Sequence, residues 1–170
     1  MDQKVDPDRI KKKYLESYHH LHSALHSKAM FLITNNFFKE VLFLLIGTWG
    51  TYNWFEEDGE ELIQAQSLEC FRNLKPVGKL FQCVGIDGEY IEMLYNKQKF
   101  KVKPELFKQT PSPTYKFGEK VRIKSKEVLG IICDINWHSK EAREMYFIEV
   151  NGKKKSTRYF SEELLNMEDD

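Results

Sequence analysis

The stretch that decides the fold is Tyr115–Leu165, YKFGEKVRIKSKEVLGIICDINWHSKEAREMYFIEVNGKKKSTRYFSEELL. It contains three runs typical of β-strands: Lys120–Lys124, Gly130–Ile135 and Tyr146–Val150. Asn151-Gly152 then predicts a two-residue hairpin turn, because both central positions of such a turn need a positive φ. Thr157–Phe160 follows as the return strand. Short strands with tight turns at this spacing predict a small closed β-barrel.

The stretch Pro76–Phe107 repeats the order of these features. In both stretches a glycine opens an apolar run, a tyrosine opens the next one, a turn with asparagine follows, and a last run ends at leucine. The matching pairs are Gly78–Val84 with Gly130–Ile135, Tyr90–Leu94 with Tyr146–Val150, Asn96-Lys97 with Asn151–Lys153, and Val102–Leu106 with Phe160–Leu164. This order indicates two copies of one small β-unit, a duplication rather than a long array. Thr110–Pro113 is the predicted linker, because proline and small polar residues form extended connections.

These residues resemble tandem SH3-like small barrels of the KOW and Tudor type. The resemblance rests on Gly118–Ile123, on Gly130 at the start of the next strand, on the hairpin, and on a one-turn helix expected at Ser161–Leu164. It covers Tyr115–Leu165 well and Leu68–Phe107 less well. It implies a fold but no ligand, because one fold hosts many functions. The Ala-Leu-Tyr-Asp-Tyr motif of SH3 domains that bind proline-rich peptides is absent.

The beginning of the chain has a helical pattern instead. Asp6-Pro7-Asp8 suits a helix start, and apolar residues then recur three and four positions apart up to Leu25. A second helix is predicted at about Lys28–Ile46, with Gly47 as its stop. Thr48–Phe55 is rich in aromatic residues, which predicts either core packing or an aromatic pocket. Glu60–Leu74 fits a helix or a short strand, with helix favoured up to about Gln66.

The chain is therefore predicted to be an α+β protein, with a helical N-terminal region followed by two SH3-like small β-barrel repeats. The predicted parts are a helical region with an aromatic-rich core at 1–66, a first SH3-like β-unit at 67–110 and a second SH3-like barrel at 111–170. The most apolar region, Met30–Tyr52, is interrupted by Lys39 and Glu40. A membrane span needs roughly 20 mostly apolar residues, so we expect a buried helix here and no membrane span.

Composition limits the classes of function. The 170 residues include 26 basic and 26 acidic side chains, so any attraction to nucleic acid must come from a local patch. Cys70, Cys83 and Cys133 lie far apart without a C-x-x-C motif, which argues against a disulfide framework and indicates a reducing cytoplasm. The charged N-terminus lacks the apolar core of a signal peptide.

Three histidines, His19, His22 and His26, have a spacing that could bring them to a metal ion on one helix face. They lack the glutamate of the metalloprotease motif, so solvent-exposed histidines are favoured, and no metal or other cofactor is predicted. The chain has no glycine-rich phosphate loop and no nucleophile elbow, and no pair of acids has a context that separates their pKa values. These observations favour a binding protein over an enzyme.

The second copy holds the candidate binding residues. Its loop after Ile135 is longer than in the first copy and carries Trp137, His138 and Arg143, and loops on a rigid barrel are frequent binding sites. The alternative is a longer hairpin whose tryptophan folds back on the barrel. The other candidates follow the second turn: Lys153, Lys154, Lys155, Arg158 and Tyr159. A basic hairpin beside aromatics can contact a phosphate backbone, although lysines also protect edge strands from aggregation.

The sequence thus predicts a cytoplasmic binding or adaptor protein that recognises a protein partner, such as an inhibitor or immunity-type factor. Balanced charge and abundant aromatic residues favour this hypothesis. The alternative is a nucleic-acid-associated module that contacts the phosphate backbone through the lysine-rich hairpin.

Overall fold

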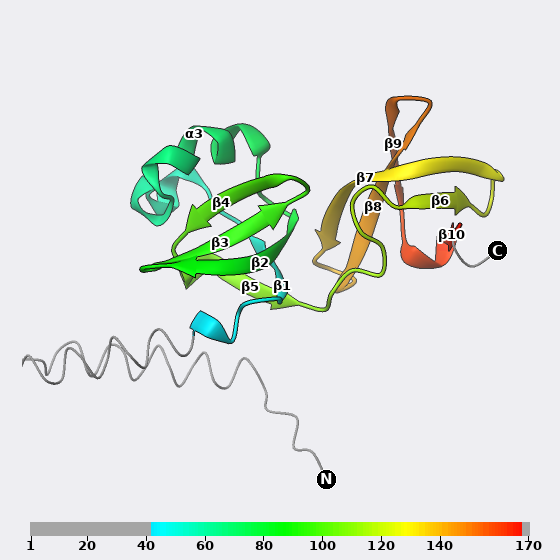
Figure 1. The fold of residues 1–170 in the computed structure, drawn as a ribbon. Helices are drawn as coiled ribbons and strands as arrows, with labels where there is room; N and C mark the ends of the chain where they lie inside the picture. The colour runs from blue at the N-terminus through cyan, green and yellow to red at the C-terminus, as the bar shows by residue number, and fades with distance from the viewer. Residues whose placement is uncertain (1–41, 168–170) are drawn as a thin grey trace, which may run out of the picture. The chain divides into compact units, whose positions relative to one another are not determined.

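A computed structural model of the chain describes residues 42–167. All of the described strands lie in one compact unit that begins at Leu45. This part is mostly β, with one short α-helix and two five-stranded antiparallel sheets (Figure 1). The two helices predicted before Gly47 fall almost entirely outside the described residues.

The first sheet has the strand order β4-β3-β2-β1-β5. Its strands are β1 (Trp49–Tyr52), β2 (Leu80–Asp87), β3 (Tyr90–Tyr95), β4 (Gln98–Val102) and β5 (Phe107–Thr110). Strand β1 falls within the range predicted as helical, 1–66, but it pairs with both β2 and β5. Between β1 and β2 the chain forms two 3-10 turns, Glu56–Asp58 and Glu60–Leu62, and helix α3, Ala65–Leu74.

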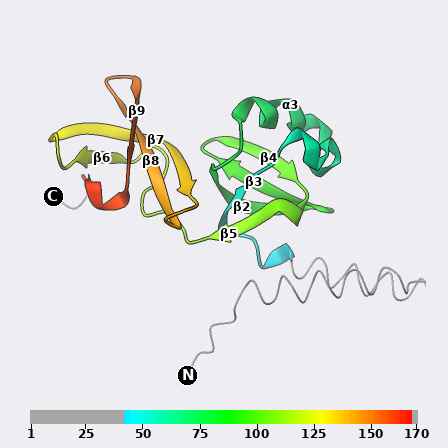
Figure 2. The same ribbon diagram turned by 180° about the vertical axis from the view of Figure 1, so that it is seen from behind.

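The second sheet has the order β10-β6-β7-β8-β9, which can be followed from behind in Figure 2. Its strands are β6 (Lys120–Ile123), β7 (Val128–His138), β8 (Arg143–Val150), β9 (Lys153–Tyr159) and β10 (Leu164–Asn166). If the five strands of each sheet are numbered from its own first strand, both sheets have the order 4-3-2-1-5. Each also has an irregularity between its second and third strands and a 3-10 turn before its last strand, Pro104–Leu106 and Ser161–Glu163.

The strand registers correct the residue matches that were predicted between the two stretches. The irregularity follows Cys83 in β2 and Ile132 in β7, so these two buried residues correspond. In the last strands, Phe107 corresponds to Leu164, because each directly follows the 3-10 turn and is buried. The sequence match had aligned Leu106 with Leu164 and Gly78 with Gly130. Burial and hydrogen-bond register, rather than shared glycines and leucines, decide the correspondence.

Neither sheet closes into a barrel, so this part of the prediction is wrong. In the first sheet a loop segment, Leu62–Gln64, occupies the outer edge of β4. Ile63 forms a bridge with Val102, and the Gln64 N–H donates to the Lys101 carbonyl at 2.9 Å. In the second sheet, β9 pairs with β8 alone among the described strands, while β10 pairs with β6. The two outer strands of each sheet, β4 and β5 in the first and β9 and β10 in the second, therefore form no ladder with each other.

Each sheet has its own core. In the first, the ring of Phe71 from α3 lies 5.1 to 6.1 Å, between centroids, from the rings of Tyr52, Trp54, Phe81 and Phe100. Tyr52 and Trp54 are buried, so core packing is the role of these two residues from Thr48–Phe55. The second core consists of Tyr115, Val121, Ile123, Ile132, Ile135, Tyr146, Ile148, Tyr159 and Leu164, and Leu80 of β2 joins it. The two sheets therefore pack together within one unit.

Candidate binding surface on the second sheet

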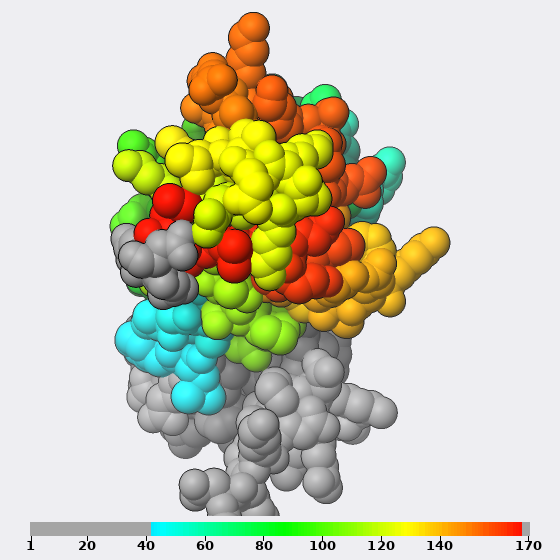
Figure 3. Space-filling view, turned by 90° about the vertical axis from the view of Figure 1, so that its right-hand side faces the viewer, coloured from blue at the N-terminus to red at the C-terminus, as the bar shows by residue number. Residues whose placement is uncertain are grey.

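The β8–β9 hairpin places four cations on an edge strand. Asn151 and Gly152 have φ values of 52° and 72°, which are the positive values predicted for this turn. Strand β9 follows, and each residue from Lys153 to Arg158 is exposed. In Figure 3 the hairpin, in orange, forms the top of the visible face. The predicted candidates Lys153, Lys154, Lys155 and Arg158 thus lie together on one strand, whereas Tyr159 at its end is buried.

The register determines which side of β9 each cation occupies. The paired residues are Lys153 with Val150, Lys154 with Glu149, Arg158 with Phe147 and Tyr159 with Tyr146. Lys154 and Arg158 are four positions apart, and their partners are two positions apart, so the irregularity adds an even number of residues. The register therefore places Lys154 and Arg158 on one side of β9, and Lys153 and the buried Tyr159 on the other. Lys155 has no ladder partner, and alternation along the continuous strand Lys153–Tyr159 puts it on the side of Lys153.

Three of these cations have no partner within the part of the chain that the structure describes: Lys153, Lys155 and Arg158. The fourth strand of the first sheet, β4, is different. Its Lys101 lies 2.5 Å from Asp87, and Lys99 lies 3.6 Å from Glu92. Lys103, which follows the strand, lies 3.6 Å from Glu89. The first sheet thus supplies counter-charges to both lysines of β4, whereas among the described residues the second sheet supplies one to only one of the four cations of β9.

Lys154 is the paired cation of β9. Its Nζ lies 2.6 Å from Oδ2 of Asp134 and 4.6 Å from the ring centroid of Phe147. The Asp134 side chain is buried, with 8% exposed, and its Oδ2 also lies 3.2 Å from Nζ of Lys79. Tyr95 donates a hydrogen bond to the same carboxylate. Because Tyr95 lies in the first sheet and Lys79 directly precedes β2, this carboxylate joins both sheets to β9.

The surroundings of Asp134 keep it charged. Burial raises the pKa of its carboxyl, but the hydrogen bonds from Lys154 and Tyr95 and the charge of Lys79 outweigh burial and hold it below its ordinary value of 3.8. Burial and the bond to Asp134 raise the pKa of Tyr95, so its hydroxyl stays protonated. The sequence analysis missed this cluster, although a charge within the apolar run Gly130–Ile135 needs a buried partner.

The other predicted candidates lie at the opposite end of β8. The side chain of Trp137 is partly buried and packs against the second core, and its backbone N–H donates to the Gly78 carbonyl at 2.7 Å. Its side chain therefore folds back on the sheet, as the alternative interpretation predicted. Arg143 pairs with Glu141 and, at 2.5 Å, with Glu162.

The ring of Phe160 links the last two candidates of this group. The guanidinium of Arg143 lies 3.5 Å from its centroid, and the His138 ring packs against it at 6.0 Å. Both side chains thus have partners within their own sheet. The structure separates Trp137, His138 and Arg143 from the cations of β9, and a role for them in binding stays a prediction.

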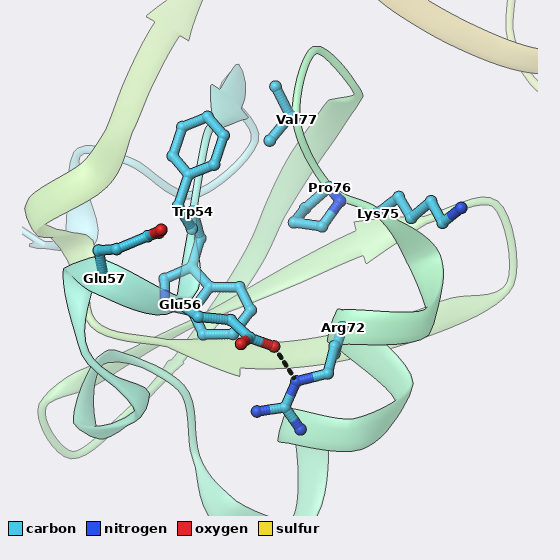
Figure 4. A pocket seen from close by; sticks show the side chains of 8 residues that line it. Trp54, Glu56, Glu57, Arg72, Lys75, Pro76 and Val77 are labelled. Atoms are coloured by element: carbon cyan, nitrogen blue, oxygen red, sulfur yellow. Dashed lines mark hydrogen bonds and ion pairs between the residues drawn. The ribbon is translucent and has the colours of Figure 1, made fainter.

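An open hollow of about 370 Å³ lies beside Trp54 on the first sheet (Figure 4). Arg72 faces Glu56 across it at 2.8 Å and also pairs with Glu60 at 2.6 Å. Val77 on its rim is exposed, and so is Phe55. The hollow thus combines an apolar rim with a paired arginine, and the charged side chains of Glu57 and Lys75 also line it.

Within residues 42–167, no three His, Cys, Asp or Glu side chains are grouped so that they could hold a metal ion. His19, His22 and His26 lie outside this range, and metal binding by them stays a prediction. None of the described helices is long and apolar enough to cross a membrane.

These features define a class of protein: two five-stranded antiparallel sheets, joined around a buried carboxylate, with a basic edge strand on the second sheet. Residues 45–165 match a family of unknown function, DUF6960, and the chain belongs to that family. The match begins before β1 and includes both sheets. No functionally curated protein matches the chain.

Proposed function

We propose that the protein is a non-enzymatic binding or adaptor protein that captures an acidic protein partner through strand β9. One observation carries this proposal: Lys153, Lys155 and Arg158 lack counter-charges among the described residues, whereas Lys99 and Lys101 of β4 have them. Unpaired cations on a molecule without net charge form a local positive patch. Carboxylates of a partner would supply the missing counter-charges.

The two sheets are further proposed to be copies of one SH3-like unit. The common strand order, the irregularity at the same place and the 3-10 turn before the last strand support this relationship. If so, one copy has acquired its own neutralising acids, and the other has kept its cations exposed. This difference between copies makes the second sheet the better candidate for partner binding.

Nucleic acid is the alternative partner, since phosphates would also pair with these cations. Two observations favour a protein. The chain has no excess of basic residues, and the aromatic residue of the strand, Tyr159, is 4% exposed. A buried ring cannot stack on a base, which is how proteins commonly bind single-stranded nucleic acid.

The test is capture of partners from a native lysate, with and without nuclease, by the tagged full chain. The double variant Lys153→Glu/Lys155→Glu reverses two of the unpaired cations. Its matched control, Lys97→Glu/Lys108→Glu, makes the same charge change at exposed lysines of the first sheet. We expect the first variant to lose the captured protein and the control to retain it, in both nuclease arms.

Two results would count against the proposal. Equal capture by both variants would remove β9 from the binding surface. Capture that disappears with nuclease, and falls steeply with salt, would replace the protein partner with nucleic acid.

A further inference from the structure

Lys153 and Lys155 form a pair on one side of β9. Side chains at alternate positions of a strand are about 7 Å apart and point the same way. Lys154, between them, points to the other side, where it binds Asp134 and covers the ring of Phe147. The hairpin therefore presents two free ammonium groups together, with the third neutralised behind them.

This arrangement matches one kind of acidic segment. In an extended peptide, alternate side chains have the same spacing of about 7 Å, so acids at positions i and i+2 can face both lysines at once. Acids in adjacent pairs separated by two neutral residues never lie at positions i and i+2, so no two of them can face both lysines at once in the extended form. The pairing thus depends on the pattern of acids as well as on their number.

We infer that β9 recognises an extended peptide segment with acidic residues at alternate positions, and that Asp134 is a positioning residue for this surface. The inference rests on the proposed function, the capture of an acidic protein by β9. Asp134 does not touch the peptide. It acts through Lys154, whose bond determines which side of the strand faces the partner. Arg158, on the Lys154 side, contributes less than Lys153 or Lys155.

The place of the Asp134 bond explains why positioning is needed. The regular ladder between β8 and β9 ends at Lys154 and resumes only at Arg158. Beyond Lys154 the strand has one neighbour and an irregular register, so the ladder alone holds it weakly. The bond from Lys154 to a buried carboxylate anchors β9 at the point where the ladder stops.

Fluorescence anisotropy with two labelled peptides tests this inference on the full chain. One peptide alternates glutamate with threonine, and the other has the same composition with its glutamates in adjacent pairs separated by two threonines, so that it has no acids at positions i and i+2. An exposed ion pair contributes about 0.2–1 kcal/mol, so the second matched pair gives the alternating peptide up to about fivefold tighter binding. An oligothymidylate of equal charge is the third probe.

Variants separate positioning from general stability. Lys154→Gln is expected to bring the ratio of the two dissociation constants close to one, and Lys154→Arg to preserve it. Arg158→Gln is also expected to preserve it. A purely structural weakening would lower the affinity for both peptides equally and leave the ratio unchanged. Asp134→Asn is also expected to bring the ratio of the two dissociation constants close to one. It is measured at a temperature where the variant is folded.

A ratio near one in the wild type, or an unchanged ratio in Lys154→Gln, would overturn the inference. Tighter binding of the oligothymidylate than of both peptides would replace the peptide with nucleic acid. If capture still depends on Lys153 and Lys155 while the two peptides bind equally, this inference fails and the proposed function stands.

Discussion

The carboxylate of Asp134 is the point where one substitution should most weaken the junction of the two sheets. It accepts bonds from Lys79, Lys154 and Tyr95. Asp134→Asn keeps the size of the side chain and removes its charge. Lys79, whose side chain is 14% exposed, then remains near the interior without a counter-charge. Lys154 is half exposed and can turn to solvent, so most of the cost arises at Lys79.

Removing one partner of a buried ion pair costs about 3–5 kcal/mol. The amide oxygen of asparagine and the hydroxyl of Tyr95 remain as acceptors for Lys79, so we expect the lower end, about 3 kcal/mol. Asp87→Asn is the matched control, because Asp87 pairs with Lys101 at 2.5 Å but is 54% exposed. Exposed pairs contribute less than about 1 kcal/mol.

The lowered pKa of Asp134 makes this loss depend on pH. The unfolded chain takes up the proton near the ordinary value of 3.8, and the folded protein takes it up only at lower pH. The stabilising contribution is therefore complete above the unfolded pKa and is lost as the pH falls through the folded one. The difference in unfolding free energy between the wild type and Asp134→Asn should be constant above about pH 5 and shrink below about pH 4.

Urea unfolding followed by tryptophan fluorescence measures these free energies, since Trp49, Trp54 and Trp137 all lie in or beside the two sheets. The comparison is made for the wild type and both variants at neutral and acid pH. If Asp134→Asn costs no more than Asp87→Asn at neutral pH, the buried carboxylate does not stabilise the junction and the reasoning is refuted.

Three further substitutions test the packing in the same unfolding assay. Gly130→Ala would place a Cβ 2.2 Å from Cγ2 of Ile148, and we expect a loss of about 1–3 kcal/mol. Gly85→Ala meets only the flexible carboxylate of Glu92, at 3.2 Å, and is expected to be near neutral. Trp137→Ala removes a partly buried side chain from the second core, so we expect a loss of about 2 kcal/mol, below the range for a fully buried tryptophan.

The predictable parts of the fold are those with local signals. The turn at Asn151-Gly152 and the strand before it follow from residues close together in sequence, whereas the return strand β9 begins at Lys153, before the predicted start at Thr157. Strand β1 has no such signal, because Trp49–Tyr52 is short and contains Gly50, and its partners β2 and β5 come much later in the chain. Barrel closure failed for the same reason, since the pairing of Leu62–Gln64 with β4 joins segments that are distant in sequence.

The candidate site divides in the same way. The sequence shows that Lys153, Lys154 and Lys155 follow a tight turn and are therefore exposed. It does not show which of them is neutralised, because that depends on Asp134 in another strand. The side chain of Trp137 presents the same difficulty. The sequence predicts it in a long loop, which indicates a binding residue, whereas in the structure Trp137 lies in β7 and its side chain packs against the second core.

The cations of β9 could serve to protect an edge strand or to bind a partner, and strand β4 helps to distinguish these two roles. Lysines on an edge strand protect it from pairing with other chains, and this could explain β9 alone. The first sheet, however, protects the equivalent edge differently: Leu62–Gln64 covers the backbone of β4, and acids neutralise its lysines. The same architecture can therefore shield this edge without unpaired charge. Lys153, Lys155 and Arg158, which have no counter-charge within residues 42–167, repel one another, and a partner with negative charge would remove that repulsion.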